Sequence, residues 1–285
     1  MNPKLGVIVV LYNPAPSHIS NIHTYLEKFD KAWIVDNSEN NLIDLGNAFE
    51  DSGKVEVIQD GINKGIAKAI NIVVQKAIAG KYSWLLTMDQ DSFFEKKEID
   101  NYVNTIKRLD GNTDIALVGV NIEMAQEGDC TKSFLEVPHV ITSGTFINLY
   151  AQPMIGEMKE DLFIDEIDTE YSYRSHLKGW KVVICKGIFM NHTIGKIVKK
   201  DLSKSGKLTN RFIHIPVRLY YMTRNHLWVR SVYKKYFPDI FKERAKQLFI
   251  IYKNNILYNP DRVGCLKMIF RGWMDFKRNK LGKIQ

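Results

Sequence analysis

Two carboxylates, Asp89 and Asp91, directly follow an apolar segment of the chain. Residues 84–88 read Trp-Leu-Leu-Thr-Met, which is typical of a buried strand, so both acids are expected where that strand ends. In an extended chain they point to the same side, and in a turn they can still converge on one cation. The segment therefore predicts a divalent metal site that holds a phosphate. The alternative is that both acids only form a turn and cap the helix expected from residue 95.

Alternating strands and helices must position these acids. Strands are expected at residues 5–11, 32–35, 55–58, 84–88 and 115–120. Helices are expected at 66–79 and 95–109, and Ser17 can cap another one. This alternation predicts a doubly wound α/β sheet, in which the connections bring the carboxyl ends of the strands to one edge. Ligands bind outside that edge in such sheets.

Polar residues recur at these predicted strand ends. Tyr12 and Asn13 follow the first strand, Asp36 ends the second, and Asn63 follows the third. We expect them to line one crevice together with the paired acids. Neither of the two common glycine-rich phosphate-binding patterns follows any of the strands. Phosphates would therefore be held by a metal ion and by side chains.

A serine and a glycine, Ser143 and Gly144, lead into another apolar strand at residues 146–149. Glycine at such an entry allows the backbone to approach a ligand closely. The alternative is an ordinary turn, in which serine and glycine are both common.

A dense acidic segment follows. Its five carboxylates are Asp161, Asp165, Glu166, Asp168 and Glu170. They alternate with apolar residues, as at a helix start that packs on a core, so Asp168 or Asp165 is a candidate general base while Glu166 is expected to face water. Glu170 and Arg174 have the spacing of a stabilising helix pair. Each acid has the alternative of being only solvated or a helix cap.

One histidine, His192, follows a further predicted strand at residues 181–185. A lone histidine is often only a hydrogen-bonded core or surface residue. Its place after a strand of the same sheet makes it a candidate third ligand to a cation held by Asp91.

Composition sets broad limits on the protein. With 285 residues and 45% hydrophobic content, the chain can bury a full core and form one large domain with an appendage. The three cysteines, at positions 130, 185 and 265, are odd in number and far apart, which argues against a disulfide framework or a clustered zinc site. A reducing cytoplasm fits this best, and we expect neither a signal segment nor a membrane span.

The net charge of +8 is unevenly distributed. Residues 196–285 contain 22 Lys and Arg against 5 Asp and Glu, a net charge of +17, whereas residues 1–195 contain 18 against 27, a net charge of −9. A basic tail of this kind predicts a polyanionic partner, which leaves nucleic acid, anionic lipid and a phosphorylated substrate. Between residues 241 and 253, an apolar helical face lies beside lysines, which suits either an anionic membrane surface or packing on the catalytic part.

Seven segments, taken in order, resemble family 2 glycosyltransferases of the GT-A fold. They are residues 9–14, 35–38, 63–71, 89–92, 143–144, 163–174, and His192 with Gly195. The Asp-Gln-Asp-Ser form at 89–92, the Phe-Ile-Asp segment and residues 216–225 resemble the rhamnosyltransferase branch in particular. Two departures are Tyr171, where that branch often has Trp, and Thr142, where Ser is common.

The resemblance implies a GT-A (Rossmann-like) α/β fold, with a mixed, mainly parallel sheet flanked by helices. Residues 1–210 would form the catalytic domain and residues 211–285 a basic, mostly helical extension. The expected reaction is inverting transfer of a sugar, L-rhamnose from dTDP-L-rhamnose, to a hydroxyl of a cell-surface polysaccharide or lipid-linked glycan. The expected location is cytoplasmic, with peripheral contact at the inner face of the cell membrane as an option and no nucleic-acid partner.

The resemblance also assigns roles to individual residues. Asp91 and His192, with Asp89 close by, would hold Mg²⁺ or Mn²⁺. Asp168 would be the catalytic base, with Asp165 as the second candidate; one base suffices because the leaving group is a diphosphate. Donor contacts are expected from Tyr12, Asn13, Asp36, Asn63, Lys64, Asp89, Arg218 and Arg224, and acceptor contacts from Ser143 and Gly144.

Two other function classes are compatible with parts of the sequence. A nucleotidyltransferase acting on a sugar phosphate would need a glycine-rich, basic loop near the N-terminus, and the sequence has none there. A non-catalytic nucleic-acid-binding protein would depend on the basic tail, in which no nucleic-acid-binding motif occurs.

Overall fold

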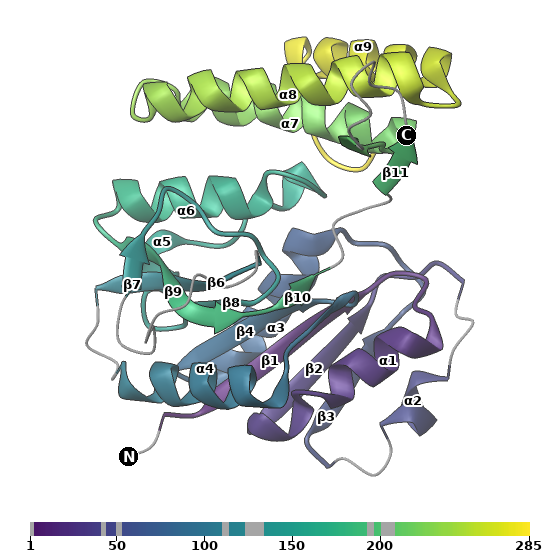
Figure 1. Ribbon diagram of the computed structural model, residues 1–285. Coiled ribbons are helices and arrows are strands. Elements are labelled where there is room, and N and C mark those ends of the chain that lie inside the picture. Colours follow the sequence, from purple (N-terminus) through teal and green to yellow (C-terminus); the bar gives the residue numbers. More distant parts are fainter. Residues whose placement is uncertain are drawn as a thin grey trace. The chain divides into compact units, whose positions relative to one another are not determined.

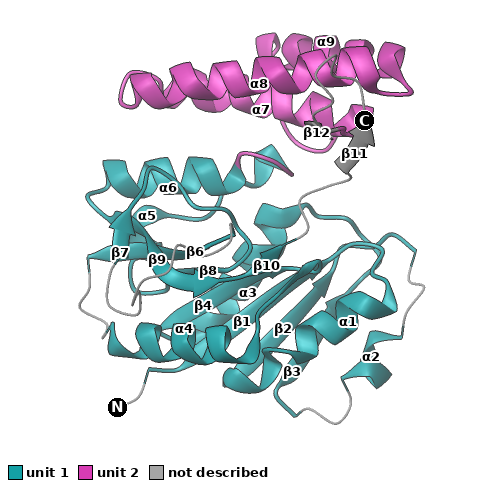
Figure 2. Ribbon diagram, viewed as in Figure 1, with its two compact units in different colours: residues 1–163, 167–192 teal, residues 164–166, 193–285 magenta. Residues whose placement is uncertain are grey.

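The computed structural model describes residues 3–40, 44–49, 53–109, 114–122, 134–192, 197–200 and 209–285. The chain divides into two compact units (Figure 2). Unit 1 comprises residues 1–163 and 167–192, and unit 2 comprises residues 164–166 and 193–285. The change of unit at residue 193 lies upstream of the predicted boundary at residue 210, and the three residues 164–166 group with the C-terminal part.

Unit 1 is built on a mixed sheet with the strand order β3-β2-β1-β4-β8-β6-β9-β7 (Figure 1). Its strands are β1 (Leu5–Leu11), β2 (Lys31–Asp36), β3 (Val55–Gln59), β4 (Trp84–Asp89), β6 (Ile115–Asn121), β7 (Phe134–Glu136), β8 (Thr145–Asn148) and β9 (Lys181–Phe189). Strand β8 runs antiparallel to β4 and β6, and β7 runs antiparallel to β9, while the other pairs are parallel. The predicted mixed, mainly parallel sheet is thus confirmed.

Helices cover both faces of this sheet. They are α1 (Pro16–His23), α2 (Leu45–Ala48), α3 (Ile66–Ala79), α4 (Lys96–Arg108), α5 (Gln152–Ile155) and α6 (Ile167–Leu177), with short 3₁₀ turns η1 (Leu26–Lys28) and η2 (Glu160–Leu162). Figure 1 shows α1 and α4 in front of the sheet and α3 behind it. Val7 and Val9 of β1 belong to the core under the front helices, and Ile8 between them is also fully buried. Burial on both faces explains why β1 is apolar at nearly every position.

A separate two-stranded sheet stands beside the end of β4. Strand β5 (Ser92–Phe93) pairs antiparallel with β10 (Asn191–His192), with His192 opposite Ser92. This pairing brings two segments about 100 residues apart in the sequence next to the paired acids.

Unit 2 is mainly helical, as predicted for the extension. Its elements are the antiparallel pair β11 (Ile197–Lys200) and β12 (Thr209–Phe212) and the helices α7 (Pro216–Tyr233), α8 (Pro238–Tyr258) and α9 (Arg262–Lys277). Helices α7 and α9 approach closely at Gly272, where a Cβ atom would lie 2.6 Å from the carbonyl oxygen of Tyr220. Over the part of the chain that the structure describes, no helix has the length and apolar character needed to cross a bilayer.

Candidate functional site

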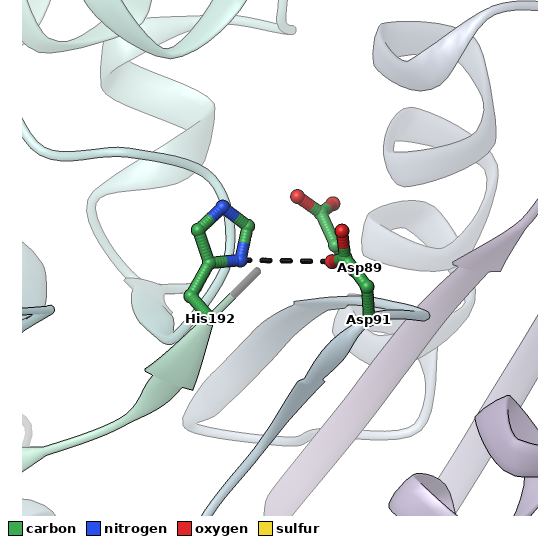
Figure 3. A group of neighbouring side chains, drawn as sticks. All are labelled: Asp89, Asp91 and His192. Atoms are coloured by element: carbon green, nitrogen blue, oxygen red, sulfur yellow. Dashed lines mark ion pairs between the residues drawn. The ribbon is translucent and has the colours of Figure 1, made fainter. Parts of the chain in front are cut away.

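The paired acids and the histidine come together at the end of β4 (Figure 3). Asp89 is the last residue of β4, Asp91 lies in the turn before β5, and His192 ends β10. One potential ligand atom from each of the three lies within 4.8 Å of the other two, and His192 Nδ1 lies 3.6 Å from Asp91 Oδ1. All three are partly exposed, as a ligand site requires. The structure therefore assembles the acidic group that the sequence predicted.

Two serines, Ser143 and Ser92, here called the serine chain, connect Asp89 to His192. The backbone N–H of Asp89 donates to Ser143 Oγ (3.0 Å), and the Ser143 hydroxyl donates to Ser92 Oγ (2.8 Å). Ser92 Oγ in turn lies 2.7 Å from His192 Nδ1. Such contacts fix the orientation of the imidazole ring and decide which ring nitrogen carries the proton.

Ser92 was not among the predicted site residues, although it is the last residue of the Asp-Gln-Asp-Ser motif. Its role depends on the pairing of β5 with β10, because that pairing sets it opposite His192. Two-residue strands have no sequence pattern that predicts them.

Ser143 and Gly144, the predicted acceptor contacts, are both buried. Ser143 is 1% exposed, and its hydroxyl accepts from the backbone N–H of Asp89 as part of the serine chain. Gly144 is buried with a φ of +76°, and a Cβ atom there would lie 2.7 Å from Met190 Sδ. In these buried positions both residues support the acidic group, and their contact with an acceptor stays a prediction.

The end of β1 is joined to the turn between the two acids. The backbone N–H of Tyr12 donates to Gln90 Oε1 (2.8 Å), and Gln90 Nε2 donates to the carbonyl oxygen of Tyr12 (3.2 Å). The Tyr12 side chain is 47% exposed, and Asn13 next to it has a φ of +46°. Tyr12 is thus held by its backbone while its ring remains accessible.

The carboxylate of Asp36 is buried at the end of β2. Its Oδ1 accepts from the backbone N–H of Ser38 (2.9 Å) and from the Ser38 hydroxyl (2.5 Å), and its Oδ2 accepts from Gln59 Nε2 (2.8 Å). Asp36 is 3% exposed. These bonds fix the carboxylate and satisfy most of its hydrogen-bonding capacity.

The predicted turn at Asn63 is held by Asn37. Asn37 Nδ2 donates to the carbonyl oxygen of Gly65 (3.1 Å), and Asn63 Oδ1 accepts from the backbone N–H of Gly65 (3.1 Å). The Lys64 ammonium pairs with Asp60 and thereby lowers the pKa of that carboxyl. Asn37 is therefore the buried link between the end of β2 and the turn directly before α3.

Asp168, the predicted base, lies in the first turn of α6. Its Oδ2 accepts from the backbone N–H of Thr142 (3.1 Å), and its Oδ1 accepts from the backbone N–H of Thr169 (2.7 Å). Thr142 directly precedes Ser143, which bonds the backbone of Asp89. Two successive residues therefore connect Asp168 with the acidic group inside unit 1.

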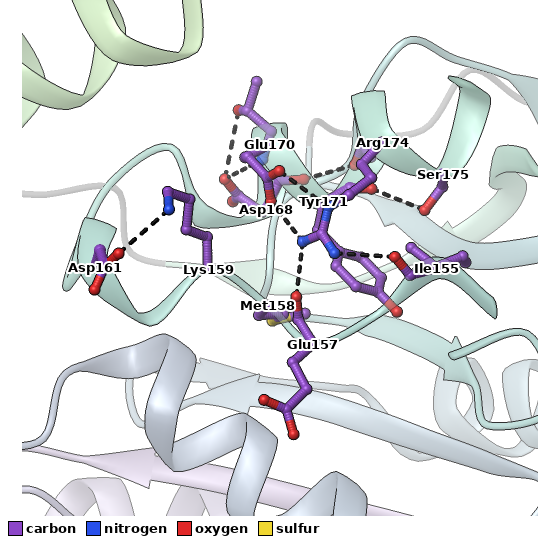
Figure 4. A network of polar contacts seen from close by, with 12 residues as sticks. Ile155, Glu157, Met158, Lys159, Asp161, Asp168, Glu170, Tyr171, Arg174 and Ser175 are labelled. Carbon is purple, nitrogen blue, oxygen red and sulfur yellow. Dashed lines mark hydrogen bonds and ion pairs between the residues drawn. The ribbon is translucent and has the colours of Figure 1, made fainter. Parts of the chain in front are cut away.

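The predicted pair of Glu170 and Arg174 is confirmed (Figure 4). Arg174 Nε donates to Glu170 Oε1 (3.0 Å) and Nη2 donates to Glu170 Oε2 (2.8 Å). The same guanidinium donates to the carbonyl oxygens of Ile155 (3.0 Å) and Glu157 (2.8 Å). The bonds to the two carbonyl oxygens fix α6 to the end of α5 and the segment after it, while the bidentate pair with Glu170 orients the guanidinium.

Residues 164–166 are held by the helices of unit 2. Arg218 Nη2 lies 3.3 Å from Asp165 Oδ1, and Glu166 accepts a hydrogen bond from the Arg244 guanidinium and lies 3.4 Å from His226 Nδ1. The expectation that Glu166 faces water is wrong, since its side chain is only 8% exposed. Its partners come from α7 and α8, far from it in the sequence.

Arg224, a predicted donor contact, is fully buried inside unit 2. Its guanidinium donates to Asn225 Oδ1, the Tyr220 hydroxyl and the carbonyl oxygen of Gly282, and it stacks on the rings of Tyr220 and Tyr221. These contacts give Arg224 a structural role, so we do not retain it as a donor ligand.

Comparison with known proteins identifies the family of this chain. The model for glycosyl transferase family 2 matches residues 7–146. A curated relative, dTDP-rhamnosyl transferase RfbF of Shigella flexneri, is 30% identical over 247 residues, which are 79% of this chain and 79% of that protein. The chain belongs to glycosyl transferase family 2.

Solved structures confirm the GT-A fold of this family 2 glycosyltransferase. GalNAc-T7 with UDP, GalNAc and Mn²⁺ superposes with a TM-score of 0.62 at 14% identity, over 97% of this chain and 56% of that one. TarS 1–349 of S. aureus in complex with UDP superposes with a TM-score of 0.52 at 14% identity, over 97% and 92% of the two chains. The glycosyltransferase thus spans little more than half of the GalNAc-T7 chain.

The acidic group of this glycosyltransferase has the composition of a divalent metal site. Two carboxylates and one imidazole suit a cation that accepts both oxygen and nitrogen ligands. The serine chain behind His192 is the kind of outer contact that orients a metal-binding histidine.

Proposed function

We propose that this protein is an inverting, metal-dependent rhamnosyltransferase. It would transfer L-rhamnose from dTDP-L-rhamnose to a hydroxyl of a cell-surface polysaccharide or of a lipid-linked glycan. The observation that carries the proposal is the convergence of Asp89, Asp91 and His192 at the carboxyl end of β4. The donor sugar is supported by the 30% identity to dTDP-rhamnosyl transferase RfbF.

Asp91 and His192, together with Asp89, would hold Mn²⁺ or Mg²⁺. The mixed set of oxygen and nitrogen ligands favours Mn²⁺, because Mg²⁺ strongly prefers oxygen alone. When bound, the cation neutralises charge on the donor diphosphate as the bond to the sugar breaks. If Nδ1 of His192 donates to Ser92 Oγ, the lone pair of Nε2 is left for the cation.

The nucleotide would lie along the ends of β1, β2 and β3. Tyr12 offers an accessible ring for stacking on the base. The same edge of the sheet also carries the other predicted donor contacts Asn13, Asp36, Asn63 and Lys64. The predicted donor contact of Arg218 stays a prediction, since this residue belongs to unit 2 and pairs there with Asp165.

Asp168 would act as the general base. Its carboxylate takes the proton of the acceptor hydroxyl, the freed oxygen forms a bond to the anomeric carbon, and the bond from that carbon to the diphosphate breaks. The nucleoside diphosphate leaves with the electron pair, and attack from the opposite side inverts the anomeric configuration. Asp168 is favoured over Asp165 because its contacts with Thr142 connect it to the acidic group within one compact unit.

A donor-binding experiment tests this function. Thermal unfolding is followed with dTDP-L-rhamnose, dTDP-glucose, UDP-sugars and GDP-sugars, each with and without Mn²⁺. We expect the largest stabilisation with dTDP-L-rhamnose and Mn²⁺ together, about 2.7 kcal/mol at a hundredfold excess over Kd. A shift of equal size without a divalent ion would contradict the metal-dependent mechanism, and a preference for another sugar would contradict the donor.

Two matched variants make the experiment specific. Asp91→Asn should abolish the Mn²⁺-dependent shift while leaving the unliganded protein folded. Asp114→Asn changes an acid of unit 1 that is 61% exposed and paired with Lys181, so it should bind donor as the wild type does. Equal donor binding by both variants would exclude Asp91 as a ligand.

A further inference from the structure

The helices of unit 2 carry a cluster of exposed apolar side chains. Phe249 of α8 is 67% exposed, Phe270 of α9 is 60% exposed, and Leu266 and Trp273 of α9 are also exposed. These four residues, here called the apolar patch, line one open groove of about 660 Å³. The rings of Phe270 and Trp273 lie 5.7 Å apart. Contiguous exposed apolar side chains of this kind mark a binding surface.

Lysines flank the apolar patch along both helices. Residues three, four or seven positions apart lie on the same side of a helix, which puts Lys242, Lys246 and Lys253 on the side of Phe249. By the same spacing, Lys267 and Lys277 lie on the side of Phe270. All five lysines are exposed, and no acidic residue occurs at these spacings from either phenylalanine. Lys246 is also paired with Glu243 (2.9 Å), so the net positive charge beside Phe249 comes mainly from Lys242 and Lys253. The surface therefore combines exposed aromatic rings with a border of net positive charge.

This combination distinguishes between two kinds of occupant. A second copy of the chain in a symmetric dimer would bring two patches with the same positive border together, and like charges at close range are unfavourable. An anionic lipid surface offers acyl chains for the aromatic rings and negative headgroups for the lysines. The charge pattern thus favours lipid.

We propose that the apolar patch and its five lysines are a docking surface for an anionic lipid bilayer. The aromatic rings enter the boundary between headgroups and acyl chains, while the ammonium groups remain among the headgroups. This membrane contact is peripheral. It does not depend on the identity of the donor sugar or of the acceptor.

Cosedimentation of the full-length protein with vesicles tests the proposal. We expect the protein to bind vesicles of phosphatidylcholine with about 30% phosphatidylglycerol and to bind phosphatidylcholine vesicles only weakly. Added salt should weaken binding to the anionic vesicles. The triple change of Lys242, Lys246 and Lys253 to Gln should weaken binding about 100-fold. The double change of Phe249 and Phe270 to Ser should also weaken it, and far-ultraviolet circular dichroism checks that both variants remain folded.

The control is a triple change of Lys96, Lys97 and Lys178 to Gln, which removes the same charge from exposed positions of unit 1. It should retain most of the affinity for anionic vesicles. No binding by the wild type at low salt would overturn the proposal, and so would equal losses in the two triple variants. A wild-type dimer that becomes monomeric on changing the two phenylalanines, with vesicle binding unaffected, would show instead that a second copy covers the patch.

Discussion

The buried carboxylate of Glu166 is hydrogen-bonded to the guanidinium of Arg244, 78 residues further along the chain. His226 Nδ1 lies 3.4 Å from the same carboxylate, and Asn225 Nδ2 donates to the carbonyl oxygens of Ile164 and Asp165. Asp165 and Glu166 have φ values of +62° and +67°, which are unfavourable for residues with side chains. The contacts with α7 and α8 therefore hold a strained segment directly before α6.

Removing Arg244 should destabilise the protein markedly. Burial alone would raise the pKa of Glu166, but the hydrogen bond with His226 and the charge of Arg244 lower it below its usual range. In Arg244→Met the buried carboxylate loses its main cationic partner, and we expect a loss of about 3 kcal/mol in the free energy of unfolding. Urea denaturation measures this loss. Lys246→Met, at an exposed pair with Glu243, should cost less than about 1 kcal/mol, and equal effects would contradict the importance of the buried pair.

Acid should destabilise the protein through His214. Burial and then the nearby charge of Arg218 lower the pKa of His214 from its usual value to about 4. Between that value and the usual one near 6.5, the unfolded chain binds a proton that the folded chain does not, so stability falls as the pH falls through this range. Urea denaturation at several pH values should show a smaller loss in His214→Gln than in wild type. His23→Gln, at an exposed position, should retain the wild-type pH dependence.

Kinetic measurements can decide whether Asp168 or Asp165 is the catalytic base. Asp168→Asn removes the proposed base and should lower kcat by about 10²- to 10⁴-fold, with little change in the KM for donor. Asp165→Asn should lower kcat less than about tenfold, because its carboxylate is paired with Arg218 in unit 2. Initial rates of glycan formation at varied donor concentration give kcat and KM for both variants. The opposite order of effects would make Asp165 the base.

Ser92 should contribute to metal affinity without touching the metal. Ser92→Ala removes the hydroxyl 2.7 Å from His192 Nδ1, and we expect Mn²⁺ affinity to fall about tenfold in titration calorimetry. Ser175→Ala is the control, because that buried hydroxyl bonds only the carbonyl oxygen of Tyr171 among the contacts the structure gives for it. Unchanged Mn²⁺ affinity in Ser92→Ala would mean that the serine chain does not orient the ligand.

Two glycines with similar backbones should differ in their tolerance of a side chain. Gly144 and Gly179 have φ values of +76° and +82°, so alanine is strained at both. At Gly144 the Cβ atom would also clash with Met190 and Val120, whereas nothing lies within 4 Å of it at Gly179. We expect a loss of about 1 kcal/mol for Gly179→Ala and at least about 3 kcal/mol for Gly144→Ala in thermal or urea unfolding. Similar losses would mean that the core around Met190 adapts to the added methyl group.

Local sequence patterns are sufficient to predict the sheet and the acidic group. Strands covered on both faces, such as β1 and β4, are apolar at nearly every position, and the parallel connections fix which ends share an edge. Asp89 and Asp91 could therefore be placed from their position after a strand. The position of His192 after a predicted strand made it a candidate ligand in the same way. The short pairing of β10 with β5, which places His192 beside the acids, leaves no pattern in the sequence.

The surroundings of Glu166 and Arg224 were not predictable in this way. Local spacing made Glu166 look like a solvated acid, but its environment is set by Arg244 and His226 from other helices. Arg224 looked like a ligand because it is a charged residue in a recognisable segment, whereas the tyrosines of its own helix enclose it. In both cases tertiary contacts, which no local pattern encodes, decide the role of the charge.

The grouping of residues 164–166 with unit 2 has a consequence for protein engineering. The chain passes from one unit to the other three times, after Phe163, after Glu166 and after His192. A chimera joined at residue 193 would separate Glu166 and Asp165 from the helices that hold them. Exchange of acceptor or surface properties between relatives should therefore transplant two segments together, residues 164–166 and residues 193–285.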